Sequence, residues 1–209
     1  SFNQNIGQWD TSNVTTMETM FTGAVSFNQN IGQWDTSNVT TMESMFTGAL
    51  SFNQNVGNLS VSKVTTMESM FEEALLFDQN VGGWETNSLT NMSNMFLECK
   101  FFNRNVANLQ TDIVTNMNSM FHDAYYFNKS LSKFKISSLK YANEMLNYSG
   151  LLPHTYSSML ISWANQDKIK TGVTLNAENI KYNSNATNAR NILIDTYGWT
   201  ISDDGCNNC

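Results

Sequence analysis

The chain has 209 residues, a formal net charge of −7 and only 14% charged residues, and it contains no Lys or Arg before Lys63. Because a protein that binds nucleic-acid phosphates needs a stripe of basic residues, this composition argues against a nucleic-acid partner, and repulsion likewise argues against anionic membrane surfaces. There is no run of 18 apolar residues, so we expect no membrane insertion.

The first 150 residues repeat with a period of 25. Residues 1–25 recur at 26–50 with Ser44 in place of Thr19 and Leu50 in place of Val25, and later copies keep the register of the apolar columns. The repeat predicts six units followed by a capping segment: 1–25, 26–50, 51–75, 76–100, 101–125, 126–150 and the cap 151–209. Because the chain begins in phase with the repeat, we expect it to be a fragment or mature portion of a longer protein.

Each unit predicts one short strand followed by one helical turn. Residues 6–10 show no helical spacing and are expected to be extended, with Gly7 allowing close backbone approach. The spacing of the next apolar residues is three, three, one and three, which matches one face of a helix: Val14, Met17, Met20, Phe21 and Ala24. Residues 10–12 offer N-cap candidates and Gly23 a C-terminal stop.

One unit buries too few apolar side chains to offset the entropy of ordering 25 residues, so the units are expected to stack and share a core. The fold class we predict is an α/β solenoid, a leucine-rich-repeat-like right-handed coil of about six 25-residue units with short parallel strands and helical turns, plus an α/β C-terminal cap.

Two kinds of repeated column invite a functional interpretation. Asn columns begin at Asn3 and Asn5; we interpret them as internal hydrogen-bonding ladders, with a ligand-binding row as the alternative. Methionine columns begin at Met17 and Met20. Thioethers can bind Cu(I), but these columns share the expected inner face, so we assign them to core packing.

The capping segment predicts two helices and two strands. The first helix carries four residues on one face, Tyr156, Met159, Leu160 and Trp163. A short strand is expected at 173–175, a second helix over 186–197 ending at Gly198, and a closing strand at 199–201.

Other features favour neither catalysis nor a cofactor. The sequence offers no nucleophile–base pair and no metal-ligand cluster, so we expect no enzyme, no cofactor and no metal site. Cys206 and Cys209 are expected to form a local or truncated disulfide, or to be spare thiols. Cys99 replaces a small core residue, and His122 is expected in a solvated loop.

The string FNQNIGQWDTSNVTTMxxMFxGA resembles the BspA-like leucine-rich-repeat family of bacterial surface proteins in its 25/26-residue form. The resemblance covers about 150 of 209 residues and weakens in the sixth unit, where Ser130, Ala142 and Leu146 depart from the pattern. It implies an extracellular or cell-surface location on a bacterium, and adhesion to proteins of a host, a matrix or other cells.

We therefore expect a binding or adhesion module that recognises a protein or glycan partner on another cell or matrix. The expected contact residues lie beside the core columns on the strand side: Gln8, Asp10, Gln33, Asp35, Asn58, Ser60, Glu85, Asn108 and Gln110. The near identity of the first two units favours a structural spacer as one alternative. Another alternative is an ice- or polysaccharide-binding solenoid that uses the aligned Thr11, Thr36, Thr86 and Thr111.

Overall fold

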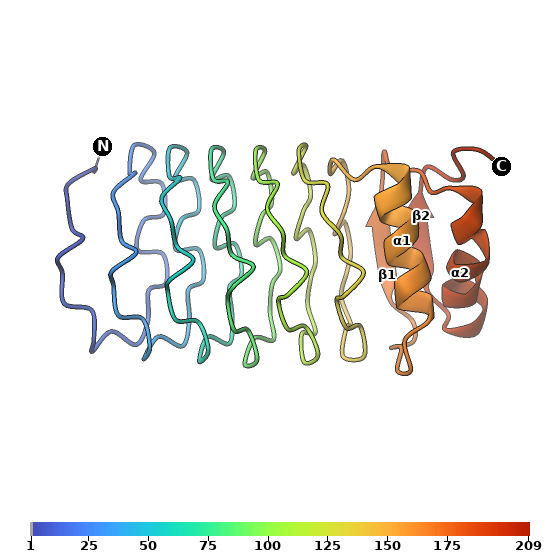
Figure 1. Ribbon diagram of the computed structural model, residues 1–209, viewed down its shortest axis with the longest axis horizontal. Coiled ribbons are helices and arrows are strands. Elements are labelled where there is room, and N and C mark those ends of the chain that lie inside the picture. Colours follow the sequence, from blue (N-terminus) through green and yellow to red (C-terminus); the bar gives the residue numbers. More distant parts are fainter. Residues whose placement is uncertain (1) are drawn as a thin grey trace.

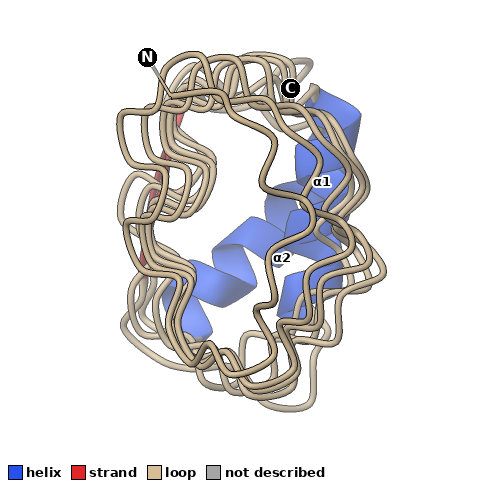
Figure 2. Cartoon of the chain, turned by 90° about the vertical axis from the view of Figure 1, so that its left-hand side faces the viewer, coloured by secondary structure: helices blue, strands red, loops and turns tan. Residues whose placement is uncertain are grey.

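The computed structural model describes residues 2–209. Irregular loops lie side by side along the long axis, and a segment with helices and strands follows at the C-terminal end (Figure 1). Seen along that axis, the loops follow nearly the same path (Figure 2). Each loop corresponds to one sequence repeat, and we number them layers 1 to 6: residues 2–25, 26–50, 51–75, 76–100, 101–125 and 126–150.

The predicted leucine-rich-repeat-like α/β solenoid is wrong. Residues 2–150 contain neither helix nor strand, only turns, irregular segments and isolated parallel bridges. The regular elements all follow Gly150: α1 (Pro153–Ala164), β1 (Thr174–Ala177), the 3₁₀ turn η1 (Ser184–Ala186), α2 (Thr187–Asn191), the π-helical turn η2 (Ile192–Thr196) and β2 (Thr200–Asp203). The molecule is therefore made mostly of loops.

The helical turn expected after Val14 fails because its backbone twice enters the left-handed region. Thr19 has φ 56° and Gly23 φ 66°, and an α-helix cannot continue through such residues. The amide of Ala24 instead closes a four-residue turn onto the Phe21 carbonyl at 3.0 Å, while the Phe21 amide donates to the carbonyl of Met45 in layer 2 at 2.9 Å. Consecutive turns thus place the same side chains inward as a helical face would.

The strand expected at residues 6–10 is also absent from layer 1, because two turns occupy this region. The Gly7 amide donates to the side chain of Asn5 at 3.1 Å, and the Trp9 amide donates to the Ile6 carbonyl at 3.1 Å. The expected close approach is confirmed, since a Cβ on Gly7 would lie 2.8 Å from the carbonyl oxygen of Asn30.

Two columns of phenylalanine run through the core. At each junction between layers a ring from one column stacks closely on a ring from the other, as Phe46 of layer 2 and Phe52 of layer 3 do at 4.0 Å between centroids. Between layers each ring stacks on its counterpart, with Phe46 and Phe71 5.5 Å apart. The methionine columns are buried beside them from Met42 to Met120, which confirms their assignment to core packing.

The Asn3 column forms the expected internal ladder. The Asn28 side-chain oxygen accepts the amide of Asn53 in the next layer at 3.0 Å and the side-chain amide of Gln54 at 3.0 Å. The bond from a backbone amide to the side-chain oxygen of the preceding layer recurs in the later layers, as far as the amide of Leu152. These side chains therefore replace backbone-to-backbone pairing where the turns leave amides without a carbonyl partner.

The C-terminal segment continues the contacts of the layers. Trp163 of α1 donates its indole N–H to the carbonyl of Leu131 at 3.1 Å, as Trp34 does to Ile6. On the other side, the amide of Leu146 donates to Asn176 of β1 at 3.1 Å. The helices and strands predicted for this segment are present with shifted ends, and β1 pairs with β2 in parallel.

Candidate binding surfaces

The residues predicted to contact a partner lie together along one edge of the layers. Adjacent layers are joined there by threonine hydroxyls, since Thr11 donates to the carbonyl of Asp35 at 3.0 Å and Thr36 to that of Ser60 at 2.9 Å. We call the nine residues the polar row; seven are exposed and two, Ser60 and Gln110, are half-buried. Whether the row binds anything stays a prediction.

Several side chains of the polar row also serve the local backbone. The Asp10 carboxylate accepts the Ser12 hydroxyl at 2.7 Å and the Ser12 amide at 3.1 Å, and these two bonds lower the pKa of Asp10. The Gln110 side chain accepts the amide of Thr86 at 2.7 Å. Asp10 therefore caps a turn, not the expected helix.

The aligned threonines do not form an exposed face. Thr11, Thr36, Thr86 and Thr111 are buried, and their hydroxyls donate to carbonyls of the next layer. The interrupting Val61 is buried as well. An ice- or polysaccharide-binding surface made of these hydroxyls is therefore not present.

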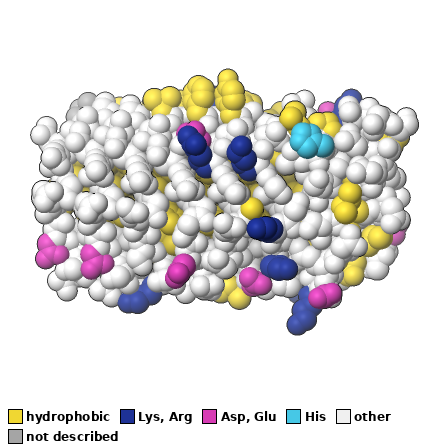
Figure 3. All heavy atoms as spheres, in the orientation of Figure 1, with side chains coloured by type: hydrophobic (Ala, Val, Ile, Leu, Met, Phe, Trp, Pro, Cys, Tyr) yellow, Lys and Arg dark blue, Asp and Glu magenta, His cyan; other side chains and the backbone are white. Residues whose placement is uncertain are grey.

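A second surface, missed by the sequence analysis, is apolar. Leu76, Phe101, Tyr125 and Tyr126 are each between 48% and 59% exposed, and we call them the hydrophobic ridge. Leu76, Phe101 and Tyr126 follow one another at intervals of 25 residues, and hydrophobic side chains gather along the upper edge in Figure 3. The sequence feature that could have revealed the ridge is one repeat column. It contains serine at Ser26 and Ser51 and large apolar residues from Leu76 onward.

The two central aromatic rings of the ridge cover one another. Phe101 and Tyr126 stack with their centroids 5.2 Å apart. Beside them, the Lys100 ammonium lies 5.9 Å from the centre of the Tyr125 ring. The Asp123 carboxylate raises the pKa of Tyr125 by its charge and by a hydrogen bond, so this phenol stays neutral. The ridge is thus an ordered apolar strip with a cation at one side.

Two shallow grooves adjoin the polar row near α1. One, of about 590 Å³, is lined in part by Asn108, Gln110 and Lys133. The other, of about 480 Å³, lies against α1 and includes Ser162 and Lys168. Both grooves contain Asp112 and Lys135, so they form one continuous polar depression, which we call the α1 groove.

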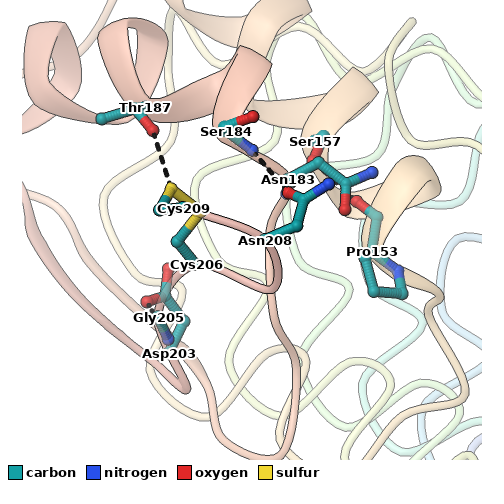
Figure 4. Close-up of a disulfide and its surroundings, with 10 residues drawn as sticks. All are labelled: Pro153, Ser157, Asn183, Ser184, Thr187, Asp203, Gly205, Cys206, Asn208 and Cys209. Carbon is teal, nitrogen blue, oxygen red and sulfur yellow. Dashed lines mark hydrogen bonds between the residues drawn. A yellow bond between two sulfur atoms is a disulfide. The ribbon is translucent and has the colours of Figure 1, made fainter.

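The cysteines and His122 are not parts of a metal centre. Cys206 and Cys209 form a disulfide, with Thr187 of α2 near the Cys209 sulfur (Figure 4). Cys99 is buried, which raises the pKa of its thiol. His122 lies in a turn, as expected, but it is half-buried between Asp123 and Glu144, at 3.7 and 3.4 Å, and so is less solvated than expected. Residues 2–209 contain no group of three acidic, Cys or His side chains suited to a metal.

Comparison with known proteins identifies a family without a known role. A family model described as "Mycoplasma protein of unknown function, DUF285" matches residues 1–100 and 75–189. Searches of curated proteins and of solved structures found no match. In residues 2–209, no helix is both long and apolar enough to cross a membrane. Because the two matches together extend from residue 1 to residue 189, the chain belongs to the DUF285 family.

Proposed function

We propose that this chain is a protein-binding module of a bacterial surface protein, with the hydrophobic ridge as its main contact surface. The exposure of four large apolar side chains in one ordered strip is the observation that supports it. Exposed apolar strips are characteristic of interaction sites, and Tyr and Phe are enriched at the centres of protein interfaces. The Phe101 and Tyr126 rings already stack on one another with centroids 5.2 Å apart, an arrangement that lowers the side-chain entropy cost of binding.

The repeat string supports the cellular location. Its resemblance to BspA-like surface proteins favours an extracellular, adhesive role, and membership of DUF285 is compatible with a repeat-type surface protein. A structural spacer accounts less well for the ridge, because a spacer needs the buried columns but no exposed aromatic strip. The polar row remains a second candidate contact surface on the same module.

The experiment is a binding screen of the full chain against purified matrix and cell-surface proteins by biolayer interferometry. The test variant is Phe101→Ser/Tyr126→Ser, because serine is the residue that the repeat itself carries at Ser26 and Ser51. The matched control is Gln8→Ala/Gln33→Ala in the polar row. We expect the test variant to weaken binding at least tenfold, about 1.4 kcal/mol, and the control to leave it unchanged.

Two outcomes contradict the proposal. If the polar-row variant loses binding and the ridge variant keeps it, the contact surface is the polar row. If the unmodified chain binds no protein in the screen, the spacer interpretation replaces the binding module. Circular dichroism and thermal unfolding of each variant show that a loss of binding does not come from unfolding.

A further inference from the structure

We propose that the α1 groove is a separate binding site for an acidic polysaccharide of the polyuronate class, a chain of sugars that carry carboxylates as well as free hydroxyls. The site is independent of the hydrophobic ridge. It involves positions 107–112 and 132–137 of layers 5 and 6 together with the end of α1, whereas the ridge involves the junctions between layers.

The floor of the groove is a backbone whose hydrogen bonds are already made. The Gln166 side chain accepts the amide of Ile136 at 3.1 Å and donates to the carbonyl of Phe134 at 2.7 Å. The Ser162 hydroxyl donates to the carbonyl of Ser132 at 2.6 Å. Because these groups are paired within the chain, a ligand in the groove meets mainly side chains, and the side chains decide what it can be.

Lys135 is the central cation of the groove. Its backbone is held in place by two hydrogen bonds. The Lys135 amide donates to the Thr111 hydroxyl at 2.6 Å, and the same hydroxyl donates to the Lys135 carbonyl at 3.1 Å. The backbone is thus fixed and the side chain is exposed. Lys133 and Lys168 line the groove on its two sides. Among the ion pairs of residues 2–209, none involves these three lysines.

The charge of the surrounding surface favours an anion. Residues 2–62 carry four carboxylates and no basic side chain, a net charge of −4. The groove itself is lined by three lysines and two carboxylates, a net charge of +1. In Figure 3 acidic side chains are spaced along the lower edge from the N-terminal end onward, and most basic ones appear around the middle of the molecule, some of them beside acidic ones. An acidic ligand is therefore attracted toward the α1 groove and away from the first two layers.

Two carboxylates in the groove select among anions. Asp112 and Asp167 line it beside the lysines. A polyphosphate offers no hydrogen-bond donors and would be repelled by these groups, because ionised carboxylates only accept hydrogen bonds. A uronic acid satisfies both charges, since its carboxylate pairs with lysine and its hydroxyls donate to aspartate. The neutral side chains of Asn108 and Asn165 supply further partners for hydroxyls.

The test is isothermal titration calorimetry of the full chain with an oligogalacturonate as the polyuronate probe. The same oligosaccharide with its carboxylates reduced to alcohols, and inorganic polyphosphate, are the comparison ligands. Lys135→Ala is the test variant, and Lys63→Ala is the matched control, because Lys63 is an exposed lysine outside the groove that bonds only to Asn38. Asp112→Asn tests the selection between the two anions.

We expect the oligogalacturonate to bind more tightly than either comparison ligand, and Lys135→Ala to weaken it at least tenfold while Lys63→Ala has no effect. Asp112→Asn should weaken the oligogalacturonate and strengthen polyphosphate. The proposal is overturned if the probe does not bind, if the reduced oligosaccharide binds equally well, if polyphosphate binds more tightly to the unmodified chain, or if both lysine variants behave alike. None of these outcomes bears on the ridge, whose test uses protein ligands.

Discussion

The ring of Phe71 lies 3.9 Å from the ring of Phe77, measured between centroids, with the two planes 12° apart. Each ring also stacks on its counterparts in neighbouring layers, Phe71 on Phe96 at 5.7 Å and Phe77 on Phe102 at 5.9 Å. The pair, Phe71 of layer 3 and Phe77 of layer 4, therefore connects the two phenylalanine columns with one another, and each ring also continues its own column along the stack. In the absence of helices and long strands in residues 2–150, these contacts and the interlayer hydrogen bonds hold the repeats together.

Phe77→Ala should destabilise the protein by about 3–5 kcal/mol, because it removes a fully buried ring and leaves a cavity between three others. The measurement is the free energy of unfolding from a urea titration. Phe101→Ala, in the exposed ridge, is the control and should change stability by less than about 0.5 kcal/mol. Equal losses for the two variants would mean that the column does not form the core.

Asn53→Ala should cost about 1–2 kcal/mol, since the Asn53 side-chain oxygen accepts the amide of Asp78 at 3.0 Å and the side chain of Gln79 at 2.7 Å. Asn53→Asp keeps the accepting oxygen and should cost much less. Asp78 already occupies the same column and accepts the amide of Asn103 at 2.9 Å. Urea titrations of both variants check this, and similar losses for Ala and Asp would exclude an acceptor role.

Glu43→Gln should stabilise the protein at neutral pH by about a few tenths of a kcal/mol. This is the usual size of a like-charge contact between side chains on neighbouring backbone segments. Partial burial raises the pKa of Glu43, and the charges of Glu68 and Glu18 raise it further. A raised folded-state pKa contributes stability that is fully present below the unfolded pKa and lost as pH rises through the folded pKa.

The gain from Glu43→Gln should therefore shrink as the pH falls through the raised folded-state pKa and be absent below the ordinary glutamate pKa of 4.5. Thermal unfolding at pH 7 and at acidic pH measures it, with the exposed Glu85→Gln as control. A variant that is less stable than the parent at pH 7 would show that Glu18 and Glu68 do not destabilise the charged form of Glu43 in the folded protein.

Asp203→Ala should destabilise the C-terminal segment by about 3–5 kcal/mol, the usual cost of removing one partner of a buried ion pair. Its fully buried carboxylate lies 2.9 Å from the Arg190 guanidinium and accepts the Tyr156 hydroxyl at 3.1 Å, so it joins β2, α2 and α1. Hydrogen exchange should show faster exchange in α1 and β2 and little change in layers 1 to 4. Asp195→Ala, an exposed substitution in η2, is the control.

The sequence predicts the register of the layers well, because the columns depend only on which side chains are apolar and 25 residues apart. It does not distinguish a helical turn from consecutive turns, since both place Val14, Met17 and Phe21 inward. The deciding fact is the left-handed backbone at Thr19 and its counterparts, and Thr, Ser, Asn and Glu at that position carry no glycine signal.

The binding surfaces were only partly predictable. The polar row follows from its position beside the core columns. The hydrophobic ridge begins only at Leu76. The repeat pattern is clearest in the two nearly identical first units, which do not contain the ridge residues. The α1 groove depends on how Gln166 and Ser162 of the C-terminal segment seat against residues 132–136, and sequence spacing does not specify that contact.

The central claim is that residues 25 apart lie side by side in neighbouring layers, and disulfide cross-linking of paired cysteine variants tests it most directly. The amide of Thr65 donates to the carbonyl of Thr40 at 2.9 Å, the amide of Thr90 donates to that of Thr65 at 2.9 Å, and all three side chains are exposed. Paired backbones lie about 4.8 Å apart, within the span of a disulfide. Thr40→Cys/Thr65→Cys and Thr65→Cys/Thr90→Cys should therefore oxidise to intramolecular disulfides, whereas Thr40→Cys/Thr90→Cys, two layers apart, should not. Cross-linking of the distant pair, or of none of the three, would contradict the account.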